Sequence, residues 1–158
     1  MDILDEELLD LWKEFELNNL EYLVVGGFAT NLNGYSRITA DLNILIKNSL
    51  KNRKILRLVL QKLGHGDFSF IEHSELVPGW TSVKLKSGFE LDIMTYIKGF
   101  DESRFDELSN NASIAEINSV KIPFLHINYL IEAKKASGRT RDILDLEELI
   151  KIRNQNEN

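Results

Sequence analysis

The sequence predicts an α/β (α+β) fold in which a mixed β-sheet is flanked by helices and followed by two carboxyl-terminal helices. Apolar runs of strand length alternate with amphipathic helical stretches over residues 1–64, which is typical of strands joined by helical links. Residues 80–96 then contain two strand-like runs separated by a short turn, and the pattern is helical again from His126 onward. Helical links favour parallel pairing and a tight turn requires antiparallel pairing, so the sheet is expected to be mixed.

Five elements are expected in the amino-terminal part of the chain. Residues 4–17 place leucine, tryptophan and phenylalanine at helical spacing with acids between them, which predicts an amphipathic helix. Residues 21–25 form an apolar run that indicates a buried strand, and residues 27–32 predict a short helix that ends at an Asn-Gly pair. A second strand is expected over residues 42–46. A second amphipathic helix is expected over residues 49–63, with a glycine directly after it.

The middle of the chain changes to a strand-like period. Residues 67–72, 80–86 and 89–96 are expected to form strands. Lys86-Ser87-Gly88 separates the last two and is a typical hairpin turn. Residues 113–122 predict short strand pieces around an Asn-Ser pair, and the following proline is expected to stop them.

The carboxyl end is predicted to contain two helices. The first covers residues 126–137, Gly138 breaks it, and the second covers about residues 140–152. The polar residues 154–158 are expected to form a tail. The chain of 158 residues has the length of one domain and shows no internal repeat or linker. Residues 1–153 are therefore expected to form a single domain.

The composition excludes several classes of protein. The chain is 43% hydrophobic and 28% charged, as in ordinary globular domains. No apolar run approaches the ~20 residues that span a bilayer, and residues 1–6 lack the basic start of a signal peptide. The absence of cysteine excludes a disulfide framework and a Cys-based zinc site, and the three histidines have no metal-ligand spacing. We expect a cytoplasmic protein without membrane association.

Charge is distributed unevenly along the chain. The net charge of −6 argues against a general affinity for nucleic acid. Residues 1–22 carry eight acids against one lysine, whereas residues 47–62 carry six basic residues and no acid. The simplest interpretation is that both segments are solvated helix faces. Alternatively, the basic helix contacts an acidic partner, a nucleic acid or the acidic amino terminus of a second copy.

A glycine turn followed by an acidic residue is the feature with the clearest chemical meaning. Gly26-Gly27 directly follows the first strand, and glycine lets the backbone turn sharply and approach a phosphate. Asp41 and Asn43 open the second strand two residues apart, so their side chains lie on the same side of it. Asp92 lies inside a later apolar run, where a carboxylate is costly unless something holds it. This layout suits a metal-bound nucleotide.

The order of these segments resembles the signature of the nucleotidyltransferase superfamily, in which a Gly-Gly or Gly-Ser turn precedes an Asp-x-Asp pair. The closing run from Ala133 to Leu146 is similar to the lysine, glycine-arginine and Arg-Asp-x-x-Asp-Leu segment of bacterial minimal nucleotidyltransferases, which include antitoxin and abortive-infection types. Matching segments extend from about residue 20 to about residue 150. The sequence departs from the family pattern at Asn43, which stands where the second acid is expected.

The resemblance implies a nucleotide-binding role for six residues. They are Gly26, Gly27, Arg37, Thr39, Lys135 and Arg139. The two glycines would face the triphosphate, and the other four would flank or approach the nucleotide. Alternatively, Lys135 complements a helix dipole without any ligand, and Arg139 pairs with Asp142 in a surface network.

The resemblance also implies that Asp41 and Asp92 are the catalytic carboxylates that hold metal, with Asn43 as a further ligand. Nucleotidyl transfer uses divalent ions, here Mg²⁺ or Mn²⁺, to activate the acceptor hydroxyl and stabilise the leaving pyrophosphate, and carboxylates hold those ions. An amide oxygen can ligate Mg²⁺ but brings no charge, so the metal cage would be less negative than in the family pattern. Alternatively, Asp41 stabilises a turn and Asp92 pairs with Arg37.

The leading expectation is a nucleotidyltransferase-fold protein that binds a nucleoside triphosphate, with ATP as the expected one, and transfers NMP to a hydroxyl acceptor. The second interpretation is a binding or regulatory module that has lost catalysis at Asn43. Such a module would act through protein contacts, as a homodimer or as the partner of a toxin or defence protein. Nucleic-acid binding by the basic helix is a weaker third interpretation, because that helix has no interleaved aromatic residues.

Overall fold

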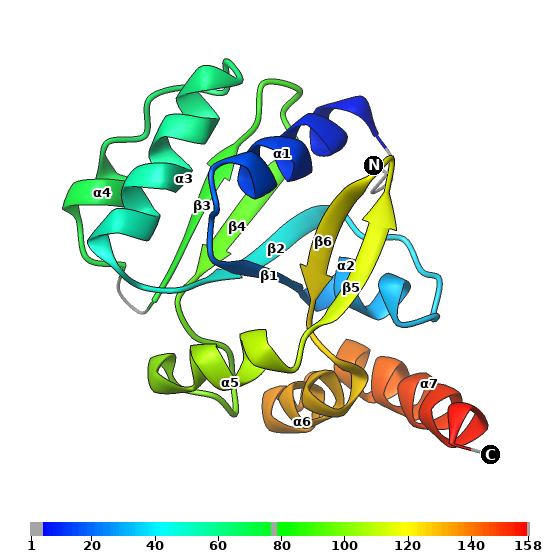
Figure 1. Cartoon of the computed structure of the whole chain (residues 1–158). Coiled ribbons are helices and arrows are strands. Elements are labelled where there is room, and N and C mark those ends of the chain that lie inside the picture. The colour runs from blue at the N-terminus through cyan, green and yellow to red at the C-terminus, as the bar shows by residue number, and fades with distance from the viewer. Residues whose placement is uncertain (1–4, 77–78, 158) are drawn as a thin grey trace.

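The computed structural model describes residues 5–76 and 79–157. Within them, six strands form one sheet in the order β3-β4-β2-β1-β6-β5 (Figure 1). The strands are β1 (Tyr22–Val25), β2 (Asp41–Ile46), β3 (Trp80–Lys84), β4 (Glu90–Met94), β5 (Ser113–Ile117) and β6 (Val120–Phe124). The pairs β2–β4 and β1–β6 are parallel, whereas β1–β2, β3–β4 and β5–β6 are antiparallel. The predicted mixed sheet is confirmed.

Helices cover both faces of this sheet. Those of the described residues are α1 (Glu6–Leu17), α2 (Gly26–Leu32), α3 (Leu50–Lys62), α4 (Phe70–His73), α5 (Phe105–Asn110), α6 (Ile127–Ser137), α7 (Thr140–Asn156) and the 3₁₀ turn η1 (Glu102–Arg104). Figure 1 shows α1 and α3 on one face and α2 on the other. The helices α6 and α7 pack together, and α6 also contacts α2. The two predicted carboxyl-terminal helices are therefore present, and the flanking-helix prediction is confirmed.

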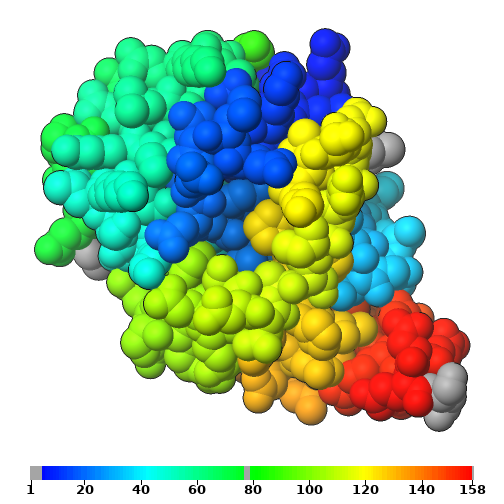
Figure 2. All heavy atoms as spheres, viewed as in Figure 1, coloured from blue at the N-terminus to red at the C-terminus, as the bar shows by residue number. Residues whose placement is uncertain are grey.

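The helix α1 covers one part of the core. The side chains that fix this helix are fully buried, namely Leu8, Leu11, Trp12 and Phe15. Tyr22 of β1 stacks on Trp12 at 6.1 Å between ring centroids and meets Phe15 edge-on at 4.8 Å. Figure 2 shows α1 seated between α3 and the β5–β6 hairpin, so it closes this side of the sheet. The predicted helix 4–17 begins at Leu4, which lies outside the described residues.

Basic side chains in and beside α3 form ion pairs with acids of the same chain. Lys62 lies 2.9 Å from Glu14 of α1, and Arg57 lies 2.7 Å from Asp67. Lys47, just before α3, lies 3.0 Å from Asp106. The partners that the sequence left open for the basic helix are thus supplied in part by α1, α5 and the loop after α3. Among the described residues, no helix has both the length and the apolar character that crossing a membrane requires.

The predicted strand at residues 67–72 is wrong, because Phe70–His73 form the helix α4. The alternating apolar residues that indicated a strand instead pack locally, with Ile71 fully buried and the rings of Phe68 and Phe70 edge-on at 6.2 Å. Two arginines of α3 hold the turn in place. Arg53 donates to the carbonyl of Ile71, and Arg57 donates to the Glu72 carboxylate at 2.9 Å.

Pro123 does not stop the strand as predicted but lies inside β6, opposite Ile114 of β5. Alternate residues of a strand point their N–H groups to the same neighbour. Because the N–H of Leu125 donates to Val24 of β1, the donor that Pro123 lacks would also face β1. The β5–β6 ladder therefore loses no hydrogen bond. The helix α7 also runs beyond the predicted end, to Asn156.

Candidate active site

The site is built around the turn between β1 and α2. Gly26 has a φ of 66°, and a Cβ atom added there would lie 2.3 Å from Nδ2 of Asn43. A Cβ added at Gly27 would lie 2.5 Å from Oγ1 of Thr39. Such distances are far shorter than any real Cβ contact. The turn packs directly on the polar side chains of Asn43 and Thr39, so any larger residue at either glycine would force one of these side chains to shift.

Gly26→Ala should destabilise the protein by roughly 1–3 kcal/mol more than Gly138→Ala. Both glycines have a φ of 66°, but a Cβ at Gly138 meets nothing within 4 Å. The two variants therefore share the backbone cost of a positive φ and differ in the contact with Asn43. Urea unfolding of the two variants and the wild type measures the difference. Equal losses would show that Asn43 moves aside freely and that the close packing has no consequence.

The strand β2 brings Asp41 and Asn43 beside the acids of β4. In the parallel β2–β4 ladder Asp41 lies opposite Glu90, and Asn43 lies opposite Asp92. Ser82 of β3 lies opposite Asp92 on its other side. Directly paired residues and residues two apart share one face of a sheet. Asp41, Asn43 and Asp92 are thus brought together on one face, as predicted from their spacing.

The Asp92 carboxylate is buried, and its hydrogen-bonding capacity is only partly satisfied. Asp92 is 7% exposed, and its Oδ1 atom has no hydrogen-bond partner. Burial raises its pKa, the neighbouring Asp41 carboxyl raises it further, and the resulting pKa is about 6. The buried Oδ1 of Asn43 also has no partner. Two unpartnered oxygens beside a second carboxylate are a donor set that suits a divalent cation.

The alternative in which Asp92 pairs with Arg37 is excluded by the geometry. The Nε atom of Arg37 lies 3.0 Å from Oδ1 of Asp145 in α7. Among the described residues, Asp41 and Asp92 have no ion-pair partner. The same residues contain no group of three or more histidine or acidic side chains placed to hold a metal. The candidate metal site therefore consists of two carboxylates and one amide, which follows from Asn43 standing in place of an acid.

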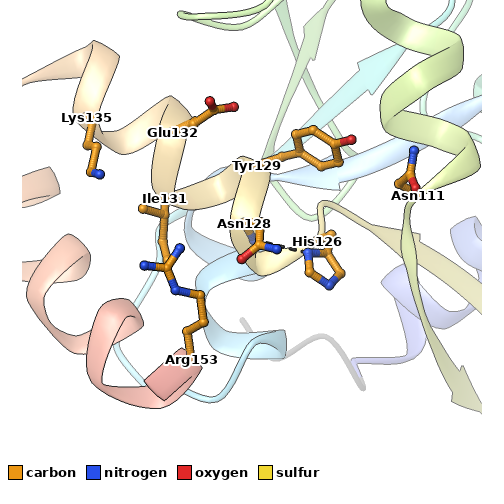
Figure 3. A pocket seen from close by; sticks show the side chains of 8 residues that line it. All are labelled: Asn111, His126, Asn128, Tyr129, Ile131, Glu132, Lys135 and Arg153. Atoms are coloured by element: carbon orange, nitrogen blue, oxygen red, sulfur yellow. Dashed lines mark hydrogen bonds between the residues drawn. The ribbon is translucent and has the colours of Figure 1, made fainter. Parts of the chain in front are cut away.

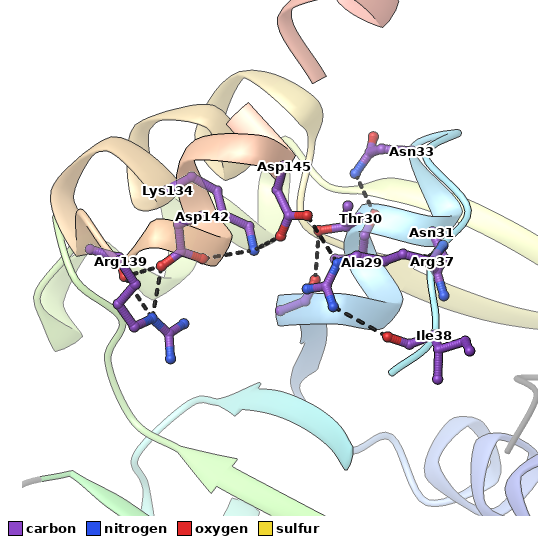
Figure 4. A network of polar contacts seen from close by, with 12 residues as sticks. Ala29, Thr30, Asn31, Asn33, Arg37, Ile38, Lys134, Arg139, Asp142 and Asp145 are labelled. Atoms are coloured by element: carbon purple, nitrogen blue, oxygen red, sulfur yellow. Dashed lines mark hydrogen bonds and ion pairs between the residues drawn. The ribbon is translucent and has the colours of Figure 1, made fainter. Parts of the chain in front are cut away.

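A buried ionic network joins the loop after α2 to the last two helices (Figure 4). Lys134 of α6 lies 3.2 Å from Asp142 and 2.9 Å from Asp145, and all three side chains are at most 7% exposed. Arg139 lies 2.8 Å from Asp142, and Arg37 completes the network at Asp145. The predicted pairing of Arg139 with Asp142 is present, but the two acids are buried instead of forming a surface network.

The Asp142 carboxylate stays ionised within this network. Burial by itself would raise the pKa of Asp142. Hydrogen bonds from Arg139 and Ser137, together with the charge of Lys134, outweigh the burial and hold the pKa at about 2. Asp142 is therefore an anion at neutral pH, in contact with Lys134 and Arg139.

A cavity of about 370 Å³ opens between the glycine turn and this network. Gly26 and Asn43 line one side, and Lys134 and Arg139 line another. The rest of the lining is partly apolar, with Trp80, Met94, Tyr96 and Ile97, and partly polar, with Lys98, Ser137 and Asp142. A cavity of this volume is in the range of small-molecule sites.

Lys135 is not brought to this cavity. Its side chain lines a separate hollow of about 550 Å³ with Arg153, His126 and Tyr129 (Figure 3). One step along a helix rotates a side chain by about 100°, so Lys134 and Lys135 face different directions. Lys134 is the lysine at the site. The signal for it was its position three and four residues after the buried Ile131 and Leu130.

Solved structures share this architecture. A candidate nucleotidyltransferase from Thermotoga maritima matches with a TM-score of 0.60 at 14% identity, over 91% of this chain and 90% of its own. The lincosamide antibiotic adenylyltransferase LnuA, solved with lincomycin bound, matches with a TM-score of 0.60 at 17% identity, over 96% and 99%. An antigenic nucleotidyltransferase-like protein from Paracoccidioides brasiliensis matches with a TM-score of 0.53 at 16% identity, over 90% and 71%.

No protein-family model and no curated protein matches the sequence. At identities of 14–17% the likeness to solved structures shows the fold alone. The chain therefore has the nucleotidyltransferase fold. Its assignment to the minimal, antitoxin or abortive-infection type stays a prediction.

Proposed function

We propose that this protein binds a nucleoside triphosphate with a divalent cation and transfers NMP to a hydroxyl acceptor. The observation that carries the proposal is the pair Asp41 and Asp92. They are adjacent on the sheet, free of ion pairs among the described residues, and placed next to a close-packed glycine turn. A protein that used these acids only for structure would be expected to neutralise them, as it neutralises Asp142 and Asp145.

Asp41, Asp92 and Oδ1 of Asn43 would hold the cation. When bound, Mg²⁺ or Mn²⁺ would neutralise phosphate charge and lower the pKa of the acceptor hydroxyl. Gly26 and Gly27 would let the triphosphate approach the backbone. Lys134 and Arg139 would make the opposite wall favourable for an anion. In the transfer a bond forms between the acceptor oxygen and the α-phosphorus, the bond from that phosphorus to pyrophosphate breaks, and a proton is released.

Asn43 favours one competing function, a binding module that keeps the fold without catalysis. The amide removes one negative charge from the place where two carboxylates and a cation would meet. In that case the protein would act through a protein partner, such as a toxin or defence protein, or as a homodimer. The two functions differ in whether a triphosphate and Mg²⁺ are bound at all.

Calorimetry with ATP, GTP, CTP and UTP, each with Mg²⁺, tests the proposal directly. We expect at least one of the four to bind at micromolar to millimolar concentration and to require Mg²⁺. The absence of binding by all four at millimolar concentration would exclude the nucleotidyl-transfer function and leave the binding module.

Asn43→Asp should lower the melting temperature of the ligand-free protein and enlarge its rise with Mg²⁺-ATP. The added carboxylate lies beside Asp41 and Asp92, and like-charge repulsion of about 2 kcal/mol would shift the melting temperature by roughly 4–8 °C in a chain of this length. Ligand binding to the folded state then recovers the loss. The exposed Asn110→Asp serves as the control for an added acid elsewhere. If Asn43→Asp and Asn110→Asp both melt like the wild type, and none of the three proteins responds to Mg²⁺-ATP, the metal assignment is wrong.

A further inference from the structure

Two aromatic side chains are exposed at the mouth of the candidate active site. Trp80 is 48% exposed and Tyr96 is 41% exposed, and both line the 370 Å³ cavity. The other large hydrophobic side chains with this degree of exposure in the described part of the chain are aliphatic. Aromatic rings left open beside a polar site are typical of surfaces that bind a planar ligand.

Trp80 lies one side-chain row from Asp92. Trp80 is paired with Met94 in the β3–β4 ladder, two residues along each strand from the pair Ser82 and Asp92. Residues two apart on a strand lie on the same face and are separated by roughly 7 Å. The row that contains Trp80 and Met94 is therefore adjacent to the row that contains Asp92.

Tyr96 is held in place by the chain just before β3. A Cβ atom on Gly79 would lie 2.2 Å from Cε1 of Tyr96, so the ring rests on bare backbone. The N–H of Thr95 donates to the carbonyl of Gly79 at 2.8 Å, which ties the two segments together. Trp80 and Tyr96 thus form one wall that is positioned before any ligand binds.

We propose that Trp80 and Tyr96 bind the nucleobase of the triphosphate by stacking, an inference that rests on the proposed function. Among the charged residues that line the cavity, the bases Lys98, Lys134 and Arg139 outnumber the acid Asp142, and Trp80 and Tyr96 add aromatic surface. This lining suits a ligand with a polyanion at one end and a flat ring at the other.

The wall also determines which bases are accepted. Trp80, Met94 and Ile97 offer no side-chain acceptor, and the hydroxyl of Thr95 is already engaged with Glu102 at 3.0 Å. The hydroxyl of Tyr96 can both donate and accept, so it does not select one hydrogen-bonding pattern of a base. Bases are therefore recognised by ring area more than by hydrogen bonds, and stacking of this kind tolerates every base. We expect purine triphosphates to bind more tightly than pyrimidine triphosphates, with little discrimination between ATP and GTP.

Tryptophan fluorescence tests the stacking, because the chain has two tryptophans and Trp12 is fully buried in the core. Titration with Mg²⁺-ATP should quench the Trp80 emission, whereas Mg²⁺-tripolyphosphate, which has no base, should not. Trp80→Ala should weaken ATP binding by about 10-fold or more, while tripolyphosphate binding is unchanged. Trp80→Phe, which keeps a ring, should retain most of the ATP affinity, and Leu58→Ala on the exposed face of α3 serves as the control.

The outcomes separate the two proposals. If the wild type binds ATP without quenching, and Trp80→Ala binds ATP as tightly as the wild type, the base lies elsewhere and the wall is free for a ring on the acceptor. That result would overturn the stacking inference alone. If the wild type binds neither ATP nor tripolyphosphate with Mg²⁺, the proposed function fails and the inference with it.

Discussion

Asp92→Asn is expected to stabilise the ligand-free protein and to abolish its response to Mg²⁺ and nucleotide. Burial and the adjacent Asp41 carboxyl raise the pKa of Asp92 from 3.8 to about 6. A difference of about two pKa units corresponds to about 3 kcal/mol of free energy that the ionised carboxylate costs the folded state. The nearly isosteric amide removes that charge, so at neutral pH the variant should unfold at a higher urea concentration.

The pH dependence has a definite sign. Because the folded-state pKa of Asp92 lies above its unfolded value, the folded wild type binds more protons than the unfolded chain between about pH 4 and pH 6. This contribution to stability is therefore fully present below about pH 4, is lost as the pH rises to about 6, and stays lost above it. Asp92→Asn should lack this decline, so the gap between variant and wild type should open across that window.

The exposed Glu116→Gln, on β5, controls for the loss of an acid elsewhere in the sheet. Asp92→Asn should also show no melting shift with Mg²⁺-ATP, because one of the two metal carboxylates is gone. Urea unfolding at several pH values, with and without Mg²⁺-ATP, measures both effects. A variant that is less stable than the wild type at neutral pH would mean that the hydrogen bond from Ser82 outweighs the cost of burying the Asp92 charge, and that the carboxylate is not reserved for a cation.

The parts of the fold that the sequence predicts well are those in which local pattern and burial agree. The apolar run at residues 22–25 is buried on both faces, and the alternation from Asp41 to Asn43 places two polar groups on one face of β2. The glycine pair marks a turn at which a larger side chain would force Asn43 or Thr39 to shift. These features depend on nearest neighbours in the sequence, so they can be predicted without knowledge of the fold.

The errors come from contacts that are distant in sequence. Residues 67–72 have an alternating pattern, but two arginines of α3 fix them as a helical turn. The helical segment at Glu102–Asn110 was not predicted, because it is short and anchored by Phe105 and Leu108 in the core. Short elements of this kind are determined by packing more than by their own propensity.

In the candidate site, too, residues set by local pattern were predicted and residues set by distant contacts were not. Asp41, Asn43 and Asp92 were expected together, and the β2–β4 register places them so. Lys135 was expected at the nucleotide, whereas the neighbouring Lys134 lines the cavity, because a helix rotation of one residue decides which side chain faces inward. The partner of Arg37 is an acid of α7 about a hundred residues later in the chain, which no local pattern could reveal.

Asp145→Asn is expected to destabilise the protein by about 3 kcal/mol or more, since it removes one carboxylate from a buried network and leaves Lys134 and Arg37 in excess. The matched control is Arg139→Ala, in which the lost side chain is 69% exposed, and which should cost less than about 1 kcal/mol. Urea unfolding at neutral pH compares the two. Near-equal losses would mean that the buried cations are solvated and that the network contributes little.

The same network should govern acid unfolding and hold the active site together. The pKa of Asp142 is lowered from 3.8 to about 2, so its contribution to stability is present above about pH 4 and is lost as the pH falls to about 2. Asp142→Asn should flatten this acid limb while leaving the decline between about pH 4 and pH 6, which belongs to Asp92, unchanged. Asp145→Asn also releases Arg37, whose loop carries Thr39 against the glycine turn. We therefore expect Asp145→Asn to weaken Mg²⁺-ATP binding even where the variant is fully folded. An unchanged affinity would mean that another group holds Arg37 in place in the variant.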